Sequence, residues 1–393
     1  MGETTVARQD ARRIVEQALP HRWLGAAAVG GLALPAAAPT ASQMYAPRGV
    51  FFNDDHLVVA DSGNHRILIW HGYPAADHQA ADVVLGQPDF ESEGPNAAGA
   101  GPEAGVHLPT GVWIHEGKLL VADAWNHRIL IWDSIPDTNH QPASYVLGQM
   151  NLTEREPNRG GAVSGSTLYW PYGLAVLDDW FYVTDTGNRR VLGWDGLPTS
   201  DRPCDLVLGQ ACDTENRENR EGAVNACSFR WPHAVAGDGQ RLYVADAGNH
   251  RVLGWVPKVE EDADANVLLG QPDMQSNSEF PYTAQGPQRM RFPYAICGEG
   301  DLLAVADTAN NRILVWQGWP DDVSNRPADA VIGQHDFDGN GENRWDSVQP
   351  DTLCWPYGIH LHRGRLAVAD SGNNRVMIWN LTRNEADVFG GAR

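Results

Sequence analysis

The chain has 393 residues, of which 42% are hydrophobic, so it is long and apolar enough to bury a sizeable core. Its formal net charge of −21 would repel phosphate backbones and anionic lipid surfaces, and no basic run offsets it. We therefore expect neither nucleic acid nor a membrane surface as a partner, and no stretch is long and apolar enough to predict a membrane span.

Residues 1–46 predict an N-terminal extension that begins with a short helix over residues 5–19, ended by Pro20. The next segment has two interpretations. Arg12–Arg13 ahead of an Ala/Gly/Leu-rich run is similar to a twin-arginine export signal. Alternatively, Leu24–Gly25 matches the end of the repeat unit that fills the rest of the chain, and this segment would supply a strand and loop that close the fold. The first interpretation implies an exported protein; with the second we expect a cytoplasmic one.

The region 47–393 consists of six copies of one unit. Each copy carries the pattern D-x-x-N-x-R after a short apolar run, and successive Asp residues are 62, 62, 61, 61 and 63 positions apart. A Pro opens an apolar stretch at the same phase in every copy. An LGQ or IGQ triplet ends the first five copies, and the sixth ends in DVFGG. The six Asp residues are Asp61, Asp123, Asp185, Asp246, Asp307 and Asp370.

Each unit predicts four short strands: one after the Pro, one before the Asp, one after the Arg and one that leads to the Gly. Four strands per repeat is the composition of a propeller blade, so the expected fold class is all-β, a six-bladed β-propeller. The units exceed a lean blade of roughly 40–45 residues. The excess joins the last strand of one blade to the first strand of the next, as at residues 88–108. These long loops are expected on one face, together with the Asp-to-Arg turns.

The sequence resembles the NHL-repeat family at the D-x-x-N-x-R turn with its preceding strand, and at the Pro-x-Gly entry seen in PTGVWI and PYGLAV. The resemblance covers residues 47–393 and implies a propeller of the NHL type. It does not imply one function, because this fold hosts binding modules and enzymes alike.

Residues that recur in every unit are expected to be structural. Asp61, Asn64 and Arg66, with their equivalents, predict a tight turn held by side-chain hydrogen bonds. The Trp at the end of each third strand is expected to pack between blades. The slot between the Asn and the Arg accepts three polar residue types, so we expect a structural or solvent-facing surface position and not a set of metal ligands. It holds His65, His127, Arg189, His250, Asn311 and Asn374.

Functional residues are expected where the repeat varies, beside the Pro. The positions two before and one after the Pro are rich in Tyr, Arg and His, and both lie where the long loop enters the innermost strand. They would line a small-molecule pocket at the mouth of the central channel or form only a polar rim. The candidates before the Pro are Tyr45, His107, Tyr169, Arg230 and Arg291, with Cys354 in the sixth unit. The candidates after the Pro are Arg48, Thr110, Tyr172, His233, Tyr294 and Tyr357.

A catalytic metal site is not predicted. A family relative with this fold, the peptidyl-hydroxyglycine amidating lyase, holds zinc with three His residues in Pro-His entries of different blades, and a zinc site needs about three protein ligands. This sequence has one such entry, at His233; His360 and His362 would join it only if their side chains turn inward. Gluconolactonases and strictosidine synthase-like propellers use channel carboxylates, whereas Asp238 and Glu299 stand only at the far ends of their strands here.

Two other motifs predict ordinary structure. The loop 335–346 partly mimics a calcium loop, but it lacks the final bidentate Glu and its first Asp recurs in other units, so we expect a turn; its oxygen ligands would be Asp336, Asp338, Asn340 and Glu342. The five Cys residues stand at irregular positions and predict free thiols, with a Cys212–Cys227 pair as the alternative. No cofactor is expected.

The sequence thus predicts a non-catalytic module that binds a protein or a small ligand through its loop-bearing face. The alternative is a propeller enzyme, a metal-dependent lyase or a lactonase-like hydrolase, with its site at the central channel.

Overall fold

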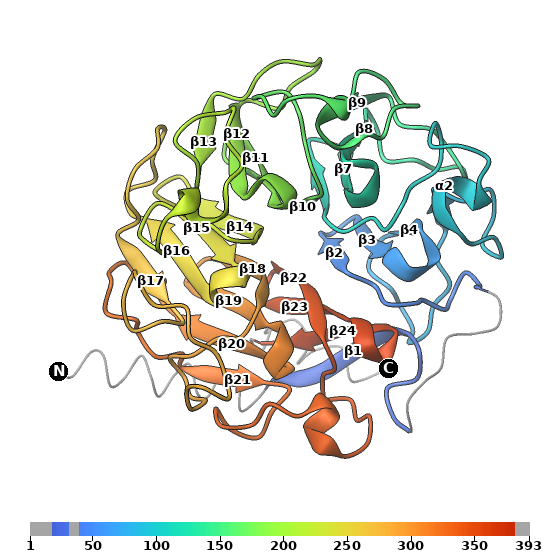
Figure 1. Ribbon diagram of the computed structural model, residues 1–393. Coiled ribbons are helices and arrows are strands. Elements are labelled where there is room, and N and C mark those ends of the chain that lie inside the picture. Colours follow the sequence, from blue (N-terminus) through green and yellow to red (C-terminus); the bar gives the residue numbers. More distant parts are fainter. Residues whose placement is uncertain (1–17, 31–38, 382–393) are drawn as a thin grey trace.

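The computed structural model describes residues 18–30 and 39–381. Six antiparallel sheets of four strands each are arranged as blades around a central axis (Figure 1). The innermost strand of each blade follows the Pro of its repeat, and the second and third strands flank the Asp-to-Arg turn. This arrangement confirms the predicted six-bladed β-propeller with four strands per blade.

The first three blades follow the repeat in order. Blade 1 has β2 (Gly49–Phe52), β3 (His56–Asp61), β4 (Arg66–His71) and β5 (Val83–Leu85). Blade 2 has β6 (Val112–His115), β7 (Lys118–Asp123), β8 (Arg128–Trp132) and β9 (Tyr145–Leu147). Blade 3 has β10 (Pro171–Leu177), β11 (Trp180–Asp185), β12 (Arg190–Asp195) and β13 (Leu206–Leu208).

The last three blades include one sheet whose strands come from both ends of the chain. Blade 4 has β14 (Pro232–Asp238), β15 (Arg241–Asp246), β16 (Arg251–Trp255) and β17 (Val267–Leu269). Blade 5 has β18 (Pro293–Glu299), β19 (Leu302–Asp307), β20 (Arg312–Gln317) and β21 (Ala330–Ile332). Blade 6 has β22 (Pro356–His362), β23 (Arg365–Asp370), β24 (Arg375–Asn380) and β1 (Leu19–Gly25).

Strand β1 is the outermost strand of blade 6, where it runs antiparallel to β24; Figure 1 shows it in blue beside the red strands. Within this pair Leu24 lies opposite Val376 and is fully buried. Residues 5–17 of the expected N-terminal helix lie outside the described residues, and so does the DVFGG segment that ends the sixth repeat. Leu19, the last residue of that expected helix, belongs to β1.

Within residues 18–30 and 39–381, helical structure is confined to short turns. The Asp-to-Arg turns are 3-10 helices: η1 (Ser62–Asn64), η2 (Ala124–Asn126), η4 (Thr186–Asn188), η6 (Ala247–Asn249), η7 (Thr308–Asn310) and η9 (Ser371–Asn373). The long loops contain α2 (Pro95–Ala98), η3 (Pro157–Gly160), η5 (Glu218–Glu221) and η8 (Glu342–Trp345). In the part of the chain that the structure describes, no helix has the length and apolar character needed to cross a membrane.

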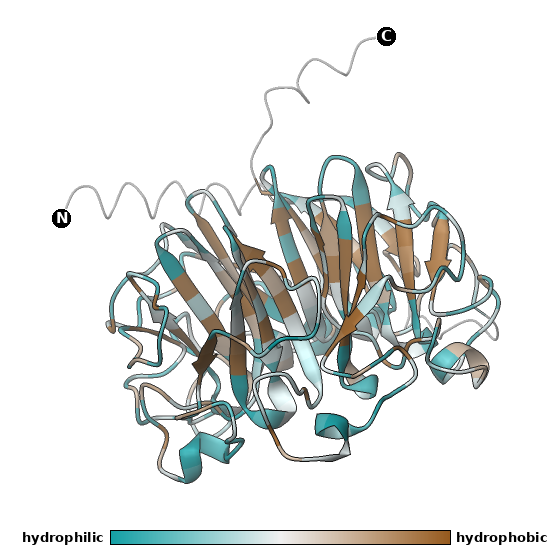
Figure 2. Cartoon of the chain, turned by 90° about the horizontal axis from the view of Figure 1, so that it is seen from above, coloured by the Kyte–Doolittle hydropathy of each residue, from teal (hydrophilic) through white to brown (hydrophobic). Residues whose placement is uncertain are grey.

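The hydrophobic core lies between neighbouring blades. Figure 2 shows the strands as largely hydrophobic and the connecting loops as largely hydrophilic. Six clusters of buried residues each combine two adjacent blades; in one of them Trp70 of blade 1 packs with Ala367 and Ala369 of blade 6. The Trp at the end of every third strand is at most 3% exposed, which agrees with the expected packing between blades; these residues are Trp70, Trp132, Trp194, Trp255, Trp316 and Trp379.

The recurrent Asp, Asn and Arg form one buried network in each blade. In blade 3, Asp185 accepts hydrogen bonds at Oδ2 from Asn188 Nδ2 and Arg190 Nε, both at 2.8 Å. The guanidinium also donates to three carbonyl oxygens of the long loops before and after the blade, those of Ser164, Thr167 and Asp213. Because the charge is paired and every donor group is used, full burial of the pair is tolerated. The network therefore fixes the loops to the blade.

Candidate functional site

A cavity of about 110 Å³ occupies the central channel. The residue one after the Pro lines it in all six blades, so the sequence candidates Arg48, Thr110, Tyr172, His233, Tyr294 and Tyr357 lie together around one axis. They form its end on the loop-bearing face, because the start of each innermost strand lies beside the Asp-to-Arg turn: Pro171 pairs with Asp185 in blade 3. We call these six residues the channel ring.

The Pro-x-Gly entry explains why the channel ring is tight. A Cβ atom on Gly49 would lie 1.8 Å from the carbonyl oxygen of Thr110, and one on Gly173 would lie 2.3 Å from that of His233. Real Cβ atoms do not approach so closely, so glycine lets the innermost strands of adjacent blades touch. Between blades 2 and 3, Thr110 Oγ1 donates a hydrogen bond of 2.6 Å to the Tyr172 carbonyl oxygen.

The residue between the Asn and the Arg connects one blade to the next. His65 Nδ1 accepts a hydrogen bond from the backbone N–H of Leu108, which precedes Pro109, and His127 Nδ1 does the same for Trp170. The amide oxygen of Asn311 takes this role for Trp355. The slot is structural, as expected, but it is not a solvent-facing surface position, because its side chain is the acceptor that holds the entry to the channel ring. Burial lowers the pKa of His65 and of His127 to about 4, so both rings are neutral acceptors at pH 7.

Arg189 breaks this connection between blades 3 and 4, because a guanidinium has no hydrogen-bond acceptor. The backbone N–H of Trp231 bonds Asp246 Oδ1 instead, at 3.2 Å. In the five other blades the residue before the Pro has φ between 46° and 51°, but Trp231 does not share this left-handed conformation. The carbonyl oxygen of Trp231 then accepts from the Ala247 N–H and lies 2.8 Å from His233 Nδ1.

This contact fixes the tautomer of His233. A carbonyl oxygen can only accept, so Nδ1 carries the proton and Nε2 carries the lone pair. His233 is 1% exposed, and its Nε2 is buried without a hydrogen-bond partner among the described residues. Burial lowers the pKa of His233 to about 3, so the ring is neutral at pH 7. The channel therefore presents a buried acceptor that no protein group satisfies.

Aromatic rings surround this acceptor. The rings of Tyr172 and Tyr294 lie on either side of His233, each with its centroid 4.3 Å away, and Tyr294 stacks on Tyr357 at 4.9 Å. The hydroxyl oxygen of Tyr172 is buried and lies within hydrogen-bonding reach of the Arg48 guanidinium, which can only donate, so the hydroxyl hydrogen has no acceptor among the described residues. Burial raises the pKa of Tyr172 well above its usual value, so this hydroxyl keeps its proton at pH 7 and can donate a hydrogen bond.

Arg48 closes the ring between Tyr357 and Thr110. Its guanidinium lies over the Tyr357 ring, with Cζ 5.0 Å from the ring centroid. The positive charge of Arg48 also acts to lower the pKa of Tyr172 and of His233, in each case as a smaller effect than burial. The side chain is half-buried. Among the described residues no carboxylate forms an ion pair with Arg48, and no Asp or Glu lines the cavity. The channel thus contains a cation that has no counter-charge among the described residues.

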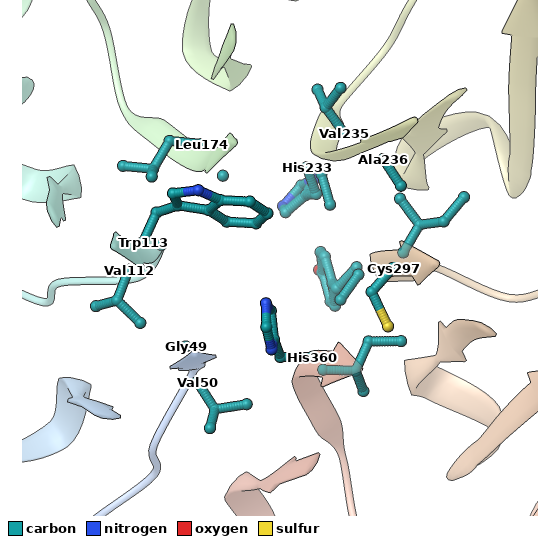
Figure 3. Close-up of a pocket in the computed structure, with 18 of the residues that line it drawn as sticks. Gly49, Val50, Val112, Trp113, Leu174, His233, Val235, Ala236, Cys297 and His360 are labelled. Atoms are coloured by element: carbon teal, nitrogen blue, oxygen red, sulfur yellow. The ribbon is translucent and has the colours of Figure 1, made fainter. Parts of the chain in front are cut away.

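The other part of the cavity is lined by side chains farther along the innermost strands. Trp113 of β6 and His360 of β22 point into the cavity in Figure 3, as does His233 of the channel ring, and Cys297 of β18 lies at the cavity wall. His360 packs against Phe51 at a centroid distance of 4.2 Å, and its Nδ1 is buried without a partner in the described structure. His360 therefore shares the cavity with His233.

His362 turns away from the channel. Its Nε2 lies 3.0 Å from Asp54 Oδ1, outside the cavity. The part of the chain with described structure contains no group of three or more His, Cys, Asp or Glu residues that could hold a metal ion. Glu299 accepts hydrogen bonds from the backbone N–H groups of Arg363 and Gly364, and Asp238 from that of Gln240. Neither of these carboxylates, which stand at the far ends of their strands, lines the cavity.

The five candidates before the Pro lie outside the lining of the cavity. Their backbone N–H groups bond the recurrent Asp, and their side chains lie on the loop-bearing face. Tyr45 and Tyr169 are 44% and 40% exposed. His107 stacks near His65 and Trp125, Arg230 pairs with Glu218, and Arg291 pairs with Glu279 at 2.7 Å. Cys354, their equivalent in blade 6, is buried.

The calcium-like loop is a turn in which Asp336 Oδ1 accepts the N–H groups of Asp338 and Gly339. Asp89 and Asp273 make the same kind of turn in other blades. All five Cys residues are free thiols, which confirms that prediction.

The cavity residues Trp113 and Cys297 were not singled out from the sequence. The signal that identifies them is the fourth position after the Pro, which also holds His360.

Comparisons with known proteins agree with the fold. A family model described as NHL repeat matches residues 45–70. NHL repeat-containing protein 2 of Bos taurus is 24% identical over 362 residues, which cover 85% of this chain and 46% of that protein. The Homo sapiens protein of the same name is 24% identical over 288 residues, covering 66% and 36%. The chain therefore spans less than half the length of these curated relatives.

Two solved structures are similar to the chain over most of its length. One is selenomethionine-substituted virginiamycin B lyase from Staphylococcus aureus, with a TM-score of 0.45, 11% identity and coverage of 88% of this chain and 98% of that one. The other is the WD40 β-propeller domain of Doa1, with a TM-score of 0.45, 11% identity and coverage of 93% and 98%. The chain thus contains a repeat that matches the NHL repeat at residues 45–70, carries five further copies in phase with it, and folds as a six-bladed β-propeller.

Proposed function

We propose that this propeller binds a small molecule in its central channel, at the end on the loop-bearing face, without catalysing a reaction. The observation that carries the proposal is the channel ring: six equivalent positions hold residues that differ from blade to blade and line one cavity. The Asp, Asn and Arg positions that hold each turn are filled alike in every blade, whereas the channel ring combines Arg, Thr, His and Tyr.

The chemistry of the ring supports the same proposal. Small-molecule sites combine apolar and aromatic walls with a few well-placed polar groups. Here the walls are Tyr172, Tyr294 and Tyr357, and the polar groups are Arg48 and the unpartnered His233 Nε2. A buried polar atom without a partner costs about 1–3 kcal/mol. A ligand that satisfies it would recover that free energy on binding.

The test is a saturation-transfer NMR screen of a small-fragment library against the wild-type protein and Thr110→Tyr. The ring already holds tyrosine in three other blades, so the backbone accommodates this residue, which would add a ring to the cavity. We expect fragments that bind the wild type to be lost in Thr110→Tyr and kept in Tyr45→Ala, an exposed position outside the cavity. Fragments that bind Thr110→Tyr as well as the wild type would overturn the proposal.

A protein partner is the second candidate, favoured by aromatic residues exposed on the loop-bearing face. Trp125 is 49% exposed, and Trp355 is 37% exposed beside the channel entrance, in addition to Tyr45 and Tyr169. A partner bound there would be released by Trp125→Ala and would tolerate Thr110→Tyr, the opposite of the pattern expected for a channel ligand. The enzyme alternative has less support, because no carboxylate among the described residues lines the cavity to act as acid or base.

A further inference from the structure

The polar groups of the channel ring select the chemistry of the ligand. Arg48 contributes only donors and a positive charge, Tyr172 contributes a hydroxyl donor, and His233 Nε2 is an acceptor only. A ligand that satisfies all three must present an anionic acceptor to Arg48 and Tyr172. It must also present a hydrogen-bond donor to His233. A simple anion fails the last requirement, because its oxygen atoms would face the lone pair of Nε2.

The anionic group is best matched by a carboxylate. A single guanidinium pairs in a planar, bidentate way with a carboxylate, which carries one negative charge. A phosphate monoester carries up to two charges at pH 7, and the described lining offers one cation on a chain with a net charge of −21. A carboxylate bound to Arg48 therefore leaves less net charge in the cavity than a phosphate monoester would.

The donor is best matched by a neutral hydroxyl. An ammonium group could also donate to His233 Nε2, but a buried ammonium needs a counter-charge, and no Asp or Glu of the described structure lines the cavity. The two ends of the ligand must also be close together. Arg48 lies within hydrogen-bonding reach of the Tyr172 hydroxyl, and the Tyr172 ring centroid is 4.3 Å from that of His233.

We infer that the channel ring recognises a 2-hydroxy carboxylate, with the carboxylate on Arg48 and Tyr172, the hydroxyl donating to His233 Nε2, and the rest of the molecule against the tyrosine rings. This inference rests on the proposed function, since it concerns the same cavity. It adds the chemical class of the ligand and the role of each polar residue.

The experiment compares matched probes on the wild-type protein by isothermal titration calorimetry. The probes are lactate and mandelate, each with a counterpart that lacks the hydroxyl (propanoate and phenylacetate), an uncharged counterpart (lactamide and mandelamide) and, for lactate, the amino counterpart alanine. We expect the hydroxy acid to bind at least about tenfold more tightly than each of its counterparts, which corresponds to about 1.4 kcal/mol. Because this comparison needs no variant, it stands even if a substituted protein fails to fold.

Two variants assign the residues. In His233→Phe, which keeps an aromatic ring but removes the acceptor, the preference for lactate over propanoate should disappear. In Arg48→Gln, the preference for lactate over lactamide should disappear. Hydroxy acids that bind no better than their counterparts would overturn the inference. If the hydroxy acids show no preference but neutral fragments still bind the wild type and not Thr110→Tyr, the proposed channel site stands and only the inferred ligand class is wrong. If no probe or fragment is sensitive to Thr110→Tyr, the proposed channel site and the inferred ligand class are both wrong.

Discussion

Arg190→Met should be among the most destabilising single changes in the propeller. The Arg190 and Asp185 side chains are both 0% exposed, and the guanidinium donates to the carboxylate and to three carbonyl oxygens. Methionine fills most of the volume but leaves Asp185 as a buried charge without its cation. Breaking a buried pair in this way costs about 3–5 kcal/mol. Typical domains have an unfolding free energy of about 5–15 kcal/mol, so the loss is a large part of the total.

Equilibrium urea unfolding measures this loss. The control is Arg217→Met, because Arg217 pairs with Glu221 on the surface at 55% and 62% side-chain exposure, where such pairs contribute about 0–1 kcal/mol. The double variant Asp185→Asn/Arg190→Met should be less destabilised than the sum of the two single variants, because no buried charge remains unpaired. An Arg190→Met protein that loses no more stability than Arg217→Met would refute the role of the buried network.

Two further outcomes follow from the connections between blades. Because the pKa of His65 and His127 is about 4 in the folded protein and about 6.5 in the unfolded chain, the unfolded state binds more protons between these values. Stability from this source is therefore present above pH 6.5 and lost as the pH falls through 4. In the double variant His65→Asn/His127→Asn, the free energy of unfolding measured with urea should fall less steeply as the pH decreases from 6.5 to 4. An unchanged pH dependence would contradict the assignment of His65 and His127 as neutral, buried acceptors. Separately, Arg189→His should restore an acceptor for the Trp231 N–H and remove the carbonyl contact of His233. Nitrogen NMR of the His233 ring should then show that the Nδ1–H tautomer, dominant in the wild type, is no longer favoured. A ring that stays in the Nδ1–H form, with the acceptor restored, would show that Arg189 does not control it.

The fold could be predicted from the sequence because its information is repeated six times. The period of the D-x-x-N-x-R turn defines the blades, and the position of each Pro defines the innermost strand. Equivalent positions in a propeller lie on a ring, so residues one after the Pro could be expected to lie together. The neighbouring candidates two before the Pro do not join them, because their backbone N–H groups are held by the Asp of their own blade while their side chains remain on the outer loop face.

The detailed chemistry of the site could not be predicted, because it depends on contacts between blades. His233 acquires its tautomer from the Trp231 carbonyl, which is available only because Arg189, in the preceding blade, cannot accept a hydrogen bond. In the same way, the composition of the His/Arg/Asn slot indicates a polar position. It does not reveal that His Nδ1 and Asn Oδ1 can each accept a hydrogen bond from the same backbone N–H group of the next blade.

The most direct test of the central claim is a crystallographic fragment screen of the wild-type protein. We expect electron density for a bound small molecule inside the channel, within hydrogen-bond distance of Arg48 and His233 Nε2. Compounds found only on the loop-bearing surface, with none entering the channel at concentrations that saturate the surface sites, would contradict it.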